Sequence, residues 1–545
     1  MEDKKMKKSS IILLMTIVLV VLNSCKDFLD QYPDQRVEWK TVEQIKNLMV
    51  TAYSEANYCG ICELSSDNLI DNQSPDTDGS NVNLPPYERW HDESFAWKQV
   101  SESGSCTPSD VWEGYYHAIA VCNHALKEME KMDSKELNGY KGEALVSRAY
   151  HHFILVNIFS HTYKNQNQTD LGIPYITEPE NVVEVFNERE TVPKTYAKIE
   201  KDLLDGMKLI DNNAYDVPSF HFNRKATYAF AARFYLFKRD WDKVIYYSNL
   251  VLGGDPADTV KTHDPRFRNW AGTFPNYLTI IYWYVDHTTP NNLLLMASYS
   301  TGSRIYNFRY GCARKAEDAT LKCNGPSSVL ARPFVGKLFL RNTDLAGSFF
   351  MGTAGELFEY TDKIAGIGHA HQVRSEFTME ETLLCRAEAK VHLGLIDEAI
   401  KDFNIYETAR VDLSKDKAVN LTRKGIIDYF SQPAIKPHVY QDLNPKSISS
   451  DWNISDEMIP FINCVLLYRR VETIHMGNRW FDIKRYGIEI THVIGKEAFH
   501  DVLKVDDERR AIQIPSEVEH AGLNPNPPNK PDPVKSIENT IKFAK

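Results

Sequence analysis

The chain has 545 residues and carries 74 acidic against 63 basic side chains, for a formal net charge of −11. An acidic surface repels the phosphates of nucleic acid and the anionic headgroups of lipids, so neither is expected as a partner. The nine cysteines are far too few for a fold held together by disulfides. The length allows one large domain or several small ones.

The first residues of the chain predict an export signal. Four lysines within residues 4–8 precede an apolar run over residues 11–22 that a single threonine interrupts. About a dozen apolar residues are too few to cross roughly 30 Å of hydrocarbon, so we expect cleavage rather than a spanning helix. The letters LNSC, which end at Cys25, resemble the bacterial lipobox, in which the cysteine is acylated. We predict a signal peptide over residues 1–24 and a lipid on Cys25. The alternative is an ordinary secretory signal followed by a chance cysteine.

Amphipathic helices are predicted over about residues 37–260 and 378–490, as the scaffold of a single domain that runs from residue 25 to residue 545. Apolar residues recur there at helical spacing, and short polar turns join successive helices into pairs. The pair within residues 380–403 has small alanines where the helices would approach, and it resembles a tetratricopeptide hairpin. The pairs do not recur at a fixed period, so the array is interrupted. One further helix is expected through residues 464–486.

Two stretches, residues 59–108 and 261–377, lack this helical period. The first is rich in Asp, Asn, Ser, Pro and Trp, and we expect a long surface excursion of the kind that carries function. The second has runs of strand formers at residues 277–285 and 293–299, separated by Gly and Pro. The predicted fold class is therefore dominated by α-helix, with an irregular insertion of loops and short strands. Both stretches are expected to carry ligand-binding loops.

Signatures of an enzyme or a metalloprotein are missing from the sequence. It contains no GxxxxGK[ST], HExxH or GxSxG motif, so we predict no catalytic residues and no cofactor. The paired carboxylates of a glycoside hydrolase cannot be recognised from spacing, which leaves that enzyme class open. Cys59 and Cys62 form a CxxC pair without the second pair that a zinc site needs. Residues 76–81 resemble a calcium loop, but the glycine is misplaced and the closing glutamate is absent. We therefore predict no metal site.

Aromatic side chains with polar neighbours gather in the two loop stretches without the spacing of a core. Planar rings can lie against the apolar CH faces of sugars, while Asp, Asn and Arg can bind hydroxyl groups in a partly desolvated cleft. Each ring could instead belong to a local core. The predicted ligand-binding residues are Asp67, Tyr87, Arg89, Trp90 and Trp97 in the first stretch, and Trp270, Tyr277, Trp283 and Tyr306 in the second.

Several short motifs occur in order along the chain. They are SCKDFLD from Ser24, WxxYYxxIxxxN from Trp112, GEA and RAY within residues 142–150, GIP at 172–174, AEA at 387–389, RWFDIKR at 479–485, and IP at 514–515 before NP at 524–525. Together and in this order they resemble the SusD/RagB family of surface lipoproteins of Bacteroidota. One departure is Met476, which stands where the family commonly has Glu.

The resemblance implies an α-helical fold of tetratricopeptide-like units whose loops carry a ligand cleft. It also implies a partner, a SusC-like TonB-dependent outer-membrane transporter, over which the protein sits as a hinged lid. The place implied is the outer face of the outer membrane, with the lipid as the only membrane contact. Family members capture oligosaccharides, or peptides in the RagB branch, without cleaving them. We therefore expect a glycan-binding protein that is not an enzyme, and the alternatives are peptide capture, a glycoside hydrolase and a pure scaffold.

Overall fold

The computed structural model describes residues 41–75, 86, 88–164, 169–179, 188–253, 277–312, 319–320, 323, 325–326, 339–341, 349–409, 420–433 and 441–527. The contacts within the chain divide it into two compact units, Met1–Gln44 and Ile45–Lys545. The described part of the first unit holds a capping box. The backbone amide of Gln44 donates to Oγ1 of Thr41 (3.2 Å), and the backbone amide of Thr41 donates to Oε1 of Gln44 (3.1 Å). These bonds satisfy backbone donors where helix α3 (Val42–Val50) begins.

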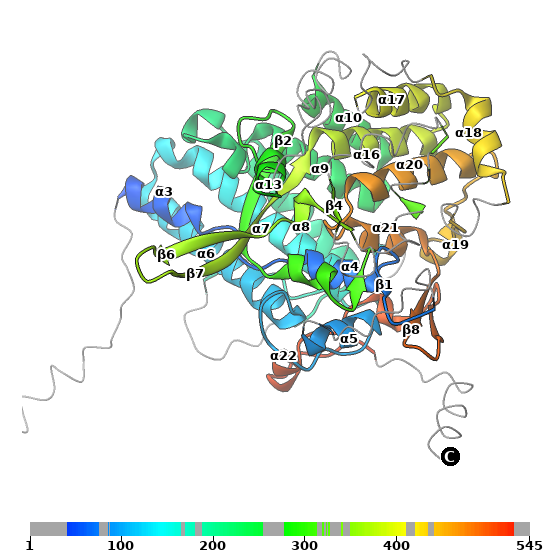
Figure 1. Cartoon of the computed structure of the whole chain (residues 1–545). Coiled ribbons are helices and arrows are strands. Elements are labelled where there is room, and N and C mark those ends of the chain that lie inside the picture. The colour runs from blue at the N-terminus through cyan, green and yellow to red at the C-terminus, as the bar shows by residue number, and fades with distance from the viewer. Residues whose placement is uncertain are drawn as a thin grey trace, which may run out of the picture. The chain divides into compact units, whose positions relative to one another are not determined.

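The unit Ile45–Lys545 is built mainly of α-helices (Figure 1). They are α4 (Cys59–Ser65), α5 (Arg89–Phe95), α6 (Pro108–Met132), α7 (Asn138–Phe159), α8 (Val192–Met207), α9 (Arg224–Lys238), α10 (Trp241–Leu252), α13 (Tyr277–Tyr284), α16 (Met379–His392), α17 (Ile396–Thr408), α18 (Arg423–Phe430), α19 (Pro445–Ile448), α20 (Ile459–Glu472), α21 (Asn478–Tyr486) and α22 (Ser516–His520). Chain neighbours pack in pairs: α6 on α7, α9 on α10, and α16 on α17. Helix α10 also packs on α16, so helices on the two sides of the insertion share one core. The predicted α-dominated fold is confirmed.

Short antiparallel strands interrupt the helices. They are β1 (Ile70–Asp71) paired with β3 (Tyr310–Gly311), β4 (Phe339–Arg341) with β5 (Phe349–Met351), β8 (Ile490–Ile494) with β9 (Phe499–Leu503), and a sheet of β2 (Asn292–Tyr299), β7 (Ile367–Thr378) and β6 (Leu357–Asp362) in the order β2-β7-β6. The 3-10 turns are η1 (Lys135–Leu137), η2 (Asn212–Ala214), η3 (Pro218–Phe220), η4 (Gly302–Asn307), η5 (Gly352–Ala354) and η6 (Glu508–Arg510). The hairpin of β6 and β7 projects away from the helices (Figure 1). The strand predicted at residues 293–299 is thus confirmed as β2.

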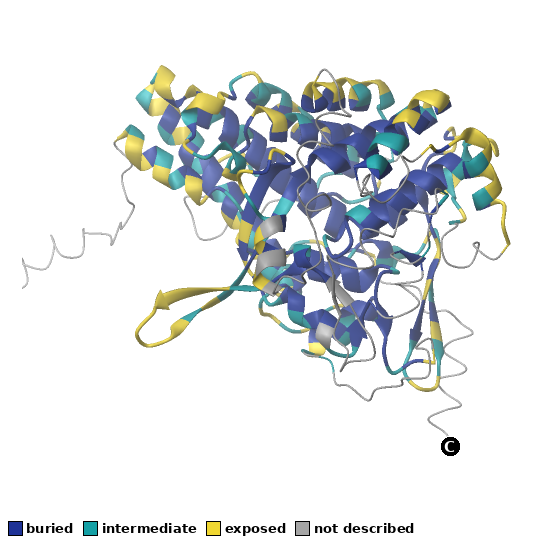
Figure 2. Cartoon of the chain, turned by 45° about the horizontal axis from the view of Figure 1, so that its top comes forward, coloured by how far each residue is buried: buried dark blue, intermediate teal, exposed yellow. Residues whose placement is uncertain are grey.

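Buried ion pairs link helices that neighbour one another. Figure 2 shows the interior of this unit buried and its peripheral helices exposed on their outer sides. Arg148 of α7 binds Asp202 of α8 with an Nε–Oδ2 distance of 2.7 Å, and Arg386 of α16 binds Asp402 of α17 with an Nη2–Oδ1 distance of 2.5 Å. Removing one partner of a buried pair costs about 3–5 kcal/mol, so these contacts hold each helix to a specific neighbour.

The strand predicted at residues 277–285 is wrong, because the chain forms helix α13 there. Strand propensity reflects how a side chain packs on a pleated surface more than a preference of its own backbone. Ile281 is buried, and its side chain lies so close to Gly355 beside η5 that a Cβ atom at Gly355 would come within 2.1 Å of it. The tertiary contact therefore outweighs the local propensity.

The single helix predicted through residues 464–486 is also wrong, because α20 ends at Glu472 and α21 begins at Asn478. His475 and Gly477 between them have φ angles of +67° and +79°. This left-handed turn packs on α4, where a Cβ atom at Gly477 would lie 3.0 Å from Cys62. Apolar residues keep helical spacing on both sides of the turn, so periodicity alone does not reveal the break.

Within the stretch 59–108, residues 59–74 do not form the surface excursion that the polar composition predicts. All seven residues of α4 are buried. The buried carboxylate of Glu63 accepts hydrogen bonds from Nδ2 of Asn68 and from the amide of Gly477, both at 2.9 Å. Polar residues can enter a core when their groups are hydrogen-bonded, and here they are. This part of the stretch therefore belongs to the interior of the protein.

Candidate functional site

The two stretches predicted to bind ligand lie next to each other in the structure. Strand β1 of the first pairs with β3 of the second. The guanidinium group of Arg309 binds Asp71 with an Nη2–Oδ2 distance of 2.7 Å, and the hydroxyl group of Tyr310 donates to Asp92 at 2.5 Å. Contacts between residues more than 200 positions apart thus join both stretches into one cluster.

The three predicted rings whose side chains the structure describes are buried. Trp90 and Tyr306 are each 2% exposed, and Trp97 is 7% exposed. The ring of Trp97 stacks on His492 at 4.0 Å, and that of Tyr306 lies 4.0 Å from His475. These rings pack against other side chains of the protein, so their faces are covered. Ligand binding by Trp90, Trp97 and Tyr306 stays a prediction, and it would require local opening of the core.

The two charged residues predicted in the first stretch differ in their surroundings. Burial alone would raise the pKa of Asp67, but the guanidinium groups of Arg470 and Arg479 outweigh burial and hold that pKa well below its usual range. Asp67 is thereby committed to a structural ion pair. Arg89 has a side chain that is 66% exposed and forms an ion pair with Glu93 at 3.0 Å. Arg89 is therefore accessible to a ligand.

The other predicted positions are placed only in part. Tyr277 and Trp283 fall on α13, but their side chains lie outside the described part of the chain. Tyr87, Trp270 and Cys25 lie outside the described residues. Their predicted roles stay predictions.

Among the exposed rings of the described residues, three belong to the three-stranded sheet. Tyr299 on β2 is 44% exposed, and Phe358 and Tyr360 on β6 are 47% and 52% exposed. Figure 2 shows the β6–β7 hairpin, which lies within the second stretch, exposed along its outer part. Sequence reasoning missed Phe358 and Tyr360. The alternation of apolar and polar residues before the turn at Gly366 is the signal for a hairpin that could have found them.

One face of this sheet combines the ring of Tyr299 with hydrogen-bonding groups. Directly opposed residues in antiparallel strands share a face, and Tyr299 opposes His371 while His369 opposes Glu359. The rings of Tyr299 and His369 are 5.5 Å apart. Imidazole and carboxylate groups therefore flank a half-exposed phenol ring, an arrangement suited to a ligand with both apolar faces and hydroxyl groups.

The other face of the hairpin carries a pair of aromatic rings. Phe358 and Tyr360 lie 4.9 Å apart at an interplanar angle of 71°. They oppose Ala370 and Gly368. A Cβ atom at Gly368 would lie 2.7 Å from the Phe358 ring and 2.0 Å from the Glu359 carbonyl oxygen, so only glycine allows this approach. The two rings thus rest on small residues and leave their outer surfaces open.

The base of the hairpin is held rigidly by the core. The Tyr299 amide donates to the Glu55 carbonyl at 2.9 Å, and the Ser300 amide donates to the Ala370 carbonyl at 3.2 Å. Further along β7, Arg374 is 3% exposed, and its Nε donates to Glu376 at 2.9 Å. The exposed rings are therefore carried on an element whose inner half is fixed.

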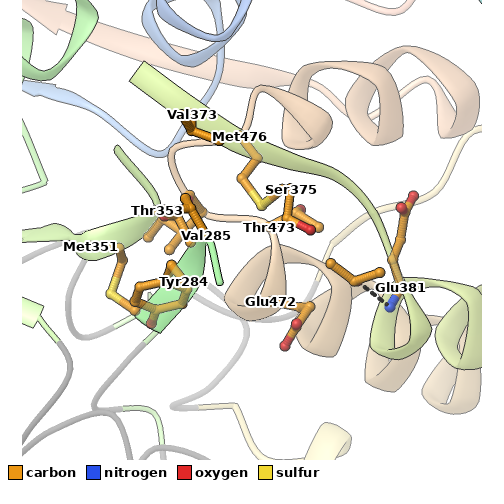
Figure 3. Close-up of a pocket in the computed structure, with 12 residues that line it drawn as sticks. Tyr284, Val285, Met351, Thr353, Val373, Ser375, Glu381, Glu472, Thr473 and Met476 are labelled. Atoms are coloured by element: carbon orange, nitrogen blue, oxygen red, sulfur yellow. Dashed lines mark hydrogen bonds between the residues drawn. The ribbon is translucent and has the colours of Figure 1, made fainter. Parts of the chain in front are cut away.

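A large groove lies elsewhere, beside α6. It has a volume of about 600 Å³, and Trp112, Tyr116 and Ile119 of α6 contribute to its lining. A second cavity, shown in Figure 3, lies among Tyr284, Met351, Glu381 and Glu472. Its volume of about 30 Å³ suits no more than about one water molecule.

The described residues form neither a disulfide nor a metal-binding site. All eight described cysteines are free, and burial raises the pKa of Cys59 to about 12 and that of Cys62 well above its usual value. Packed thiols, rather than a disulfide, are thus what the structure contains. The described part of the chain has no group of three or more His, Cys, Asp or Glu side chains placed to hold a metal ion. It also has no helix with the length and apolar character to span a membrane.

Comparison with known proteins agrees with this architecture. A family model named SusD-like, described as "Starch-binding associating with outer membrane", matches residues 27–236. A curated relative, SusD-like protein P38 of Formosa agariphila, is 24% identical over 88% of this chain and 92% of its own length.

Solved structures extend the likeness of the fold over most of the chain. A SusD superfamily protein of Bacteroides thetaiotaomicron has a TM-score of 0.57 at 17% identity, covering 89% of this chain and 98% of the other. A SusD-like carbohydrate binding protein of Bacteroides vulgatus has a TM-score of 0.54 at 14% identity, covering 88% and 96%. The chain therefore matches the SusD-like family model over residues 27–236 and shares its fold with SusD superfamily proteins over most of its length.

Proposed function

We propose that the protein is a cell-surface lipoprotein that binds oligosaccharides without cleaving them and delivers them to a SusC-like TonB-dependent transporter in the outer membrane. A lipid on Cys25 would hold it on the outer face of that membrane. The description of the matching family model and the carbohydrate-binding relative of known structure support the glycan as ligand.

The observation that carries the proposal is the set of half-exposed rings on the β2-β7-β6 sheet. Tyr299, Phe358 and Tyr360 keep between 44% and 52% of their surface exposed on a chain that buries most of its other aromatic residues. Sugar rings offer apolar CH faces for such rings, and Glu359 and His369 beside Tyr299 offer partners for hydroxyl groups. Capture would combine ring stacking with these hydrogen bonds.

Titration calorimetry of the full chain against starch-derived, plant, host and microbial oligosaccharides tests the proposal. We expect at least one glycan class to bind, and we expect Tyr299→Ala and Tyr360→Ala each to weaken its binding about ten-fold or more, since each removes a stacking surface. Tyr246→Ala is the matched control, because Tyr246 on α10 is 59% exposed and lies outside this sheet.

Two outcomes would count against glycan capture. Binding of peptides with no response from the whole glycan panel would favour the peptide-capturing alternative. Release of reducing sugar from a polysaccharide by the purified protein, lost on substitution of one carboxylate, would make it a hydrolase. The delivery step is tested separately by co-purification of a TonB-dependent transporter from outer membranes of the native host.

A further inference from the structure

The groove beside α6 is a candidate for a second binding site, apart from the sheet to which we assign glycan capture. Its volume of about 600 Å³ lies within the range of about 300–1,000 Å³ that ligand pockets occupy. Helix α6 lines one side through Trp112, Tyr116, Ile119 and Ala120. Two non-helical segments, residues 174–178 and 521–524, contribute the rest of the lining together with Glu188, Arg189 and Val518.

Side chains of α6 and α7 hold the first of these segments in place. The hydroxyl group of Tyr116 donates to the Pro174 carbonyl at 2.8 Å, and Nδ2 of Asn123 donates to the Ile176 carbonyl at 3.2 Å. The Ile176 amide donates in turn to Nε2 of His152 at 3.1 Å. The groove is thus preformed. Backbone groups of this wall are already bonded, so a ligand must be recognised through side chains rather than added as a strand.

Arg189 is the one cation among the described residues that line the groove, and it is already hydrogen-bonded. Arg189 is 9% exposed and makes five hydrogen bonds to four backbone carbonyl oxygens and the Oδ1 atom of Asn526, with none to a carboxylate. Its Nη1–Asn524 bond of 2.9 Å holds the second wall against the chain. Burial lowers the pKa of Arg189 to about 10. The guanidinium group therefore serves the structure and has little capacity left for an anionic ligand.

Two carboxylates on the lining, unlike Arg189, are exposed to solvent. Glu178 and Glu188 are both exposed, and neither forms an ion pair within the part of the chain that the structure describes. The lining thus offers free negative charge next to an apolar surface of Trp112, Ile119 and Leu523. Such a combination is complementary to a ligand that has apolar side chains and a positive charge. The Tyr116 hydroxyl on the lining is already bonded to the Pro174 carbonyl, whereas both carboxylates are open to a cation.

We propose that this groove docks a short apolar segment of a partner protein that carries lysine or arginine. Apolar side chains of the segment fill the space over Trp112 and Leu523, and its cation lies against Glu178 and Glu188. The interaction does not depend on glycan capture, and the two can fail independently.

Fluorescence anisotropy of the full chain with three labelled octapeptides tests this proposal. The peptides share the same leucines and differ only in carrying lysine, glutamine or glutamate at the remaining positions. At low salt we expect the lysine peptide to bind about ten-fold or more tightly than the glutamine peptide, and the glutamate peptide to bind weakest. Raising the salt concentration should reduce the difference in affinity between the three peptides. Equal affinity for all three peptides, or binding by none, would overturn the proposal.

Two variants locate the binding. Ala120 is half-buried and lines the groove, so Ala120→Trp should fill it and weaken the lysine peptide about ten-fold or more, whereas Ala197→Trp on the exposed side of α8 should leave binding unchanged. The exposed double substitution Glu178→Gln with Glu188→Gln should bring the lysine and glutamine peptides to similar affinity without disturbing the fold. Unchanged peptide binding in Ala120→Trp, or displacement of the peptide by the glycan bound at the sheet, would contradict the assignment.

Discussion

The carboxylate of Asp67 and the guanidinium group of Arg479, 412 residues apart in the chain, form a two-pronged ion pair with N–O distances of 2.7 and 2.9 Å. The Arg479 side chain is 1% exposed, and that of Asp67 is 21% exposed. Arg470 approaches the same carboxylate at 3.4 Å. One acidic residue of the first loop stretch thus fastens that stretch to α20 and α21 near the end of the chain.

Asp67→Asn should lower the free energy of unfolding by about 3–5 kcal/mol at pH 7, because it leaves two buried guanidinium groups without their carboxylate. The pKa of Asp67 in the folded protein lies below the unfolded value of about 4, so its contribution is present above that pH and is lost as the pH falls below it. Urea unfolding at neutral and acidic pH measures both effects, and the gap between wild type and variant should shrink in acid.

Asp428→Asn serves as the control for this prediction. Asp428 pairs with Lys424 on the surface of α18, where the two side chains are 56% and 83% exposed. A solvated pair of this kind contributes less than about 1 kcal/mol. Equal losses from the two substitutions would show that burial does not distinguish the pairs.

Trp97 and Tyr360 should separate stability from ligand binding. Trp97→Ala removes a ring that is 7% exposed and should cost about 3–5 kcal/mol of unfolding free energy, with little change in glycan affinity of the folded protein. Tyr360→Ala removes a ring that is 52% exposed and should change stability by less than about 0.5 kcal/mol while weakening the glycan. Thermal unfolding and calorimetry on both variants give the comparison, and the reverse pattern would return the ligand site to the first stretch.

Gly368→Ala should disrupt the hairpin without unfolding the helices. The added methyl group would lie 2.0 Å from the Glu359 carbonyl oxygen, so β6 and β7 cannot keep their present spacing. Hydrogen exchange followed by mass spectrometry should show faster exchange of amides in residues 357–371, with the helical pairs unchanged. Gly425→Ala on α18 is the control, since its nearest neighbour, Oγ1 of Thr422, would lie at 3.3 Å. Unaltered exchange in the hairpin would contradict the role of Gly368.

Lys484 should make stability depend on pH. Its Nζ donates to the carbonyl groups of Asn157 and Ser160 at 2.5 and 2.7 Å, and burial lowers its pKa to about 7. The unfolded chain keeps this proton up to about pH 10, so above pH 7 the unfolded state binds more protons and stability rises by up to about 1.4 kcal/mol per pH unit. Urea unfolding of wild type and Lys484→Met between about pH 6 and pH 9 isolates this slope. A pH-independent difference between the two proteins would refute it.

Cys25→Ala should separate anchoring from binding. If Cys25 carries the lipid, the variant should lose its membrane attachment and uptake by the cell, while the soluble protein keeps its affinity for the glycan. Fractionation of cells and calorimetry of the purified variant provide the two measurements. Uptake at wild-type rates by the variant would exclude the lipid on Cys25 as a tether.

The helical class and the pairing of helices were open to prediction because they depend on local patterns. Apolar spacing and a short turn identified the pair of α16 with α17. The ordered motifs were enough to indicate the resemblance to SusD-like proteins. The local sequence pattern gave the wrong secondary structure at α13 and at the turn between α20 and α21. At these two places, contacts with Gly355 and with α4 determine the backbone conformation.

The candidate site was harder to predict from the sequence than the helical fold, because it depends on tertiary structure. Composition marks Trp97 as a ring among polar neighbours, but His492, which covers it, lies almost 400 residues away in the chain. Whether a ring is exposed depends on what packs over it, and the neighbours in sequence do not record this. The sequence by itself determined a helical protein with a strand insertion and many aromatic residues. Only the tertiary structure decided that Trp90, Trp97 and Tyr306 support the core while Tyr299, Phe358 and Tyr360 face solvent, because burial is set by long-range packing.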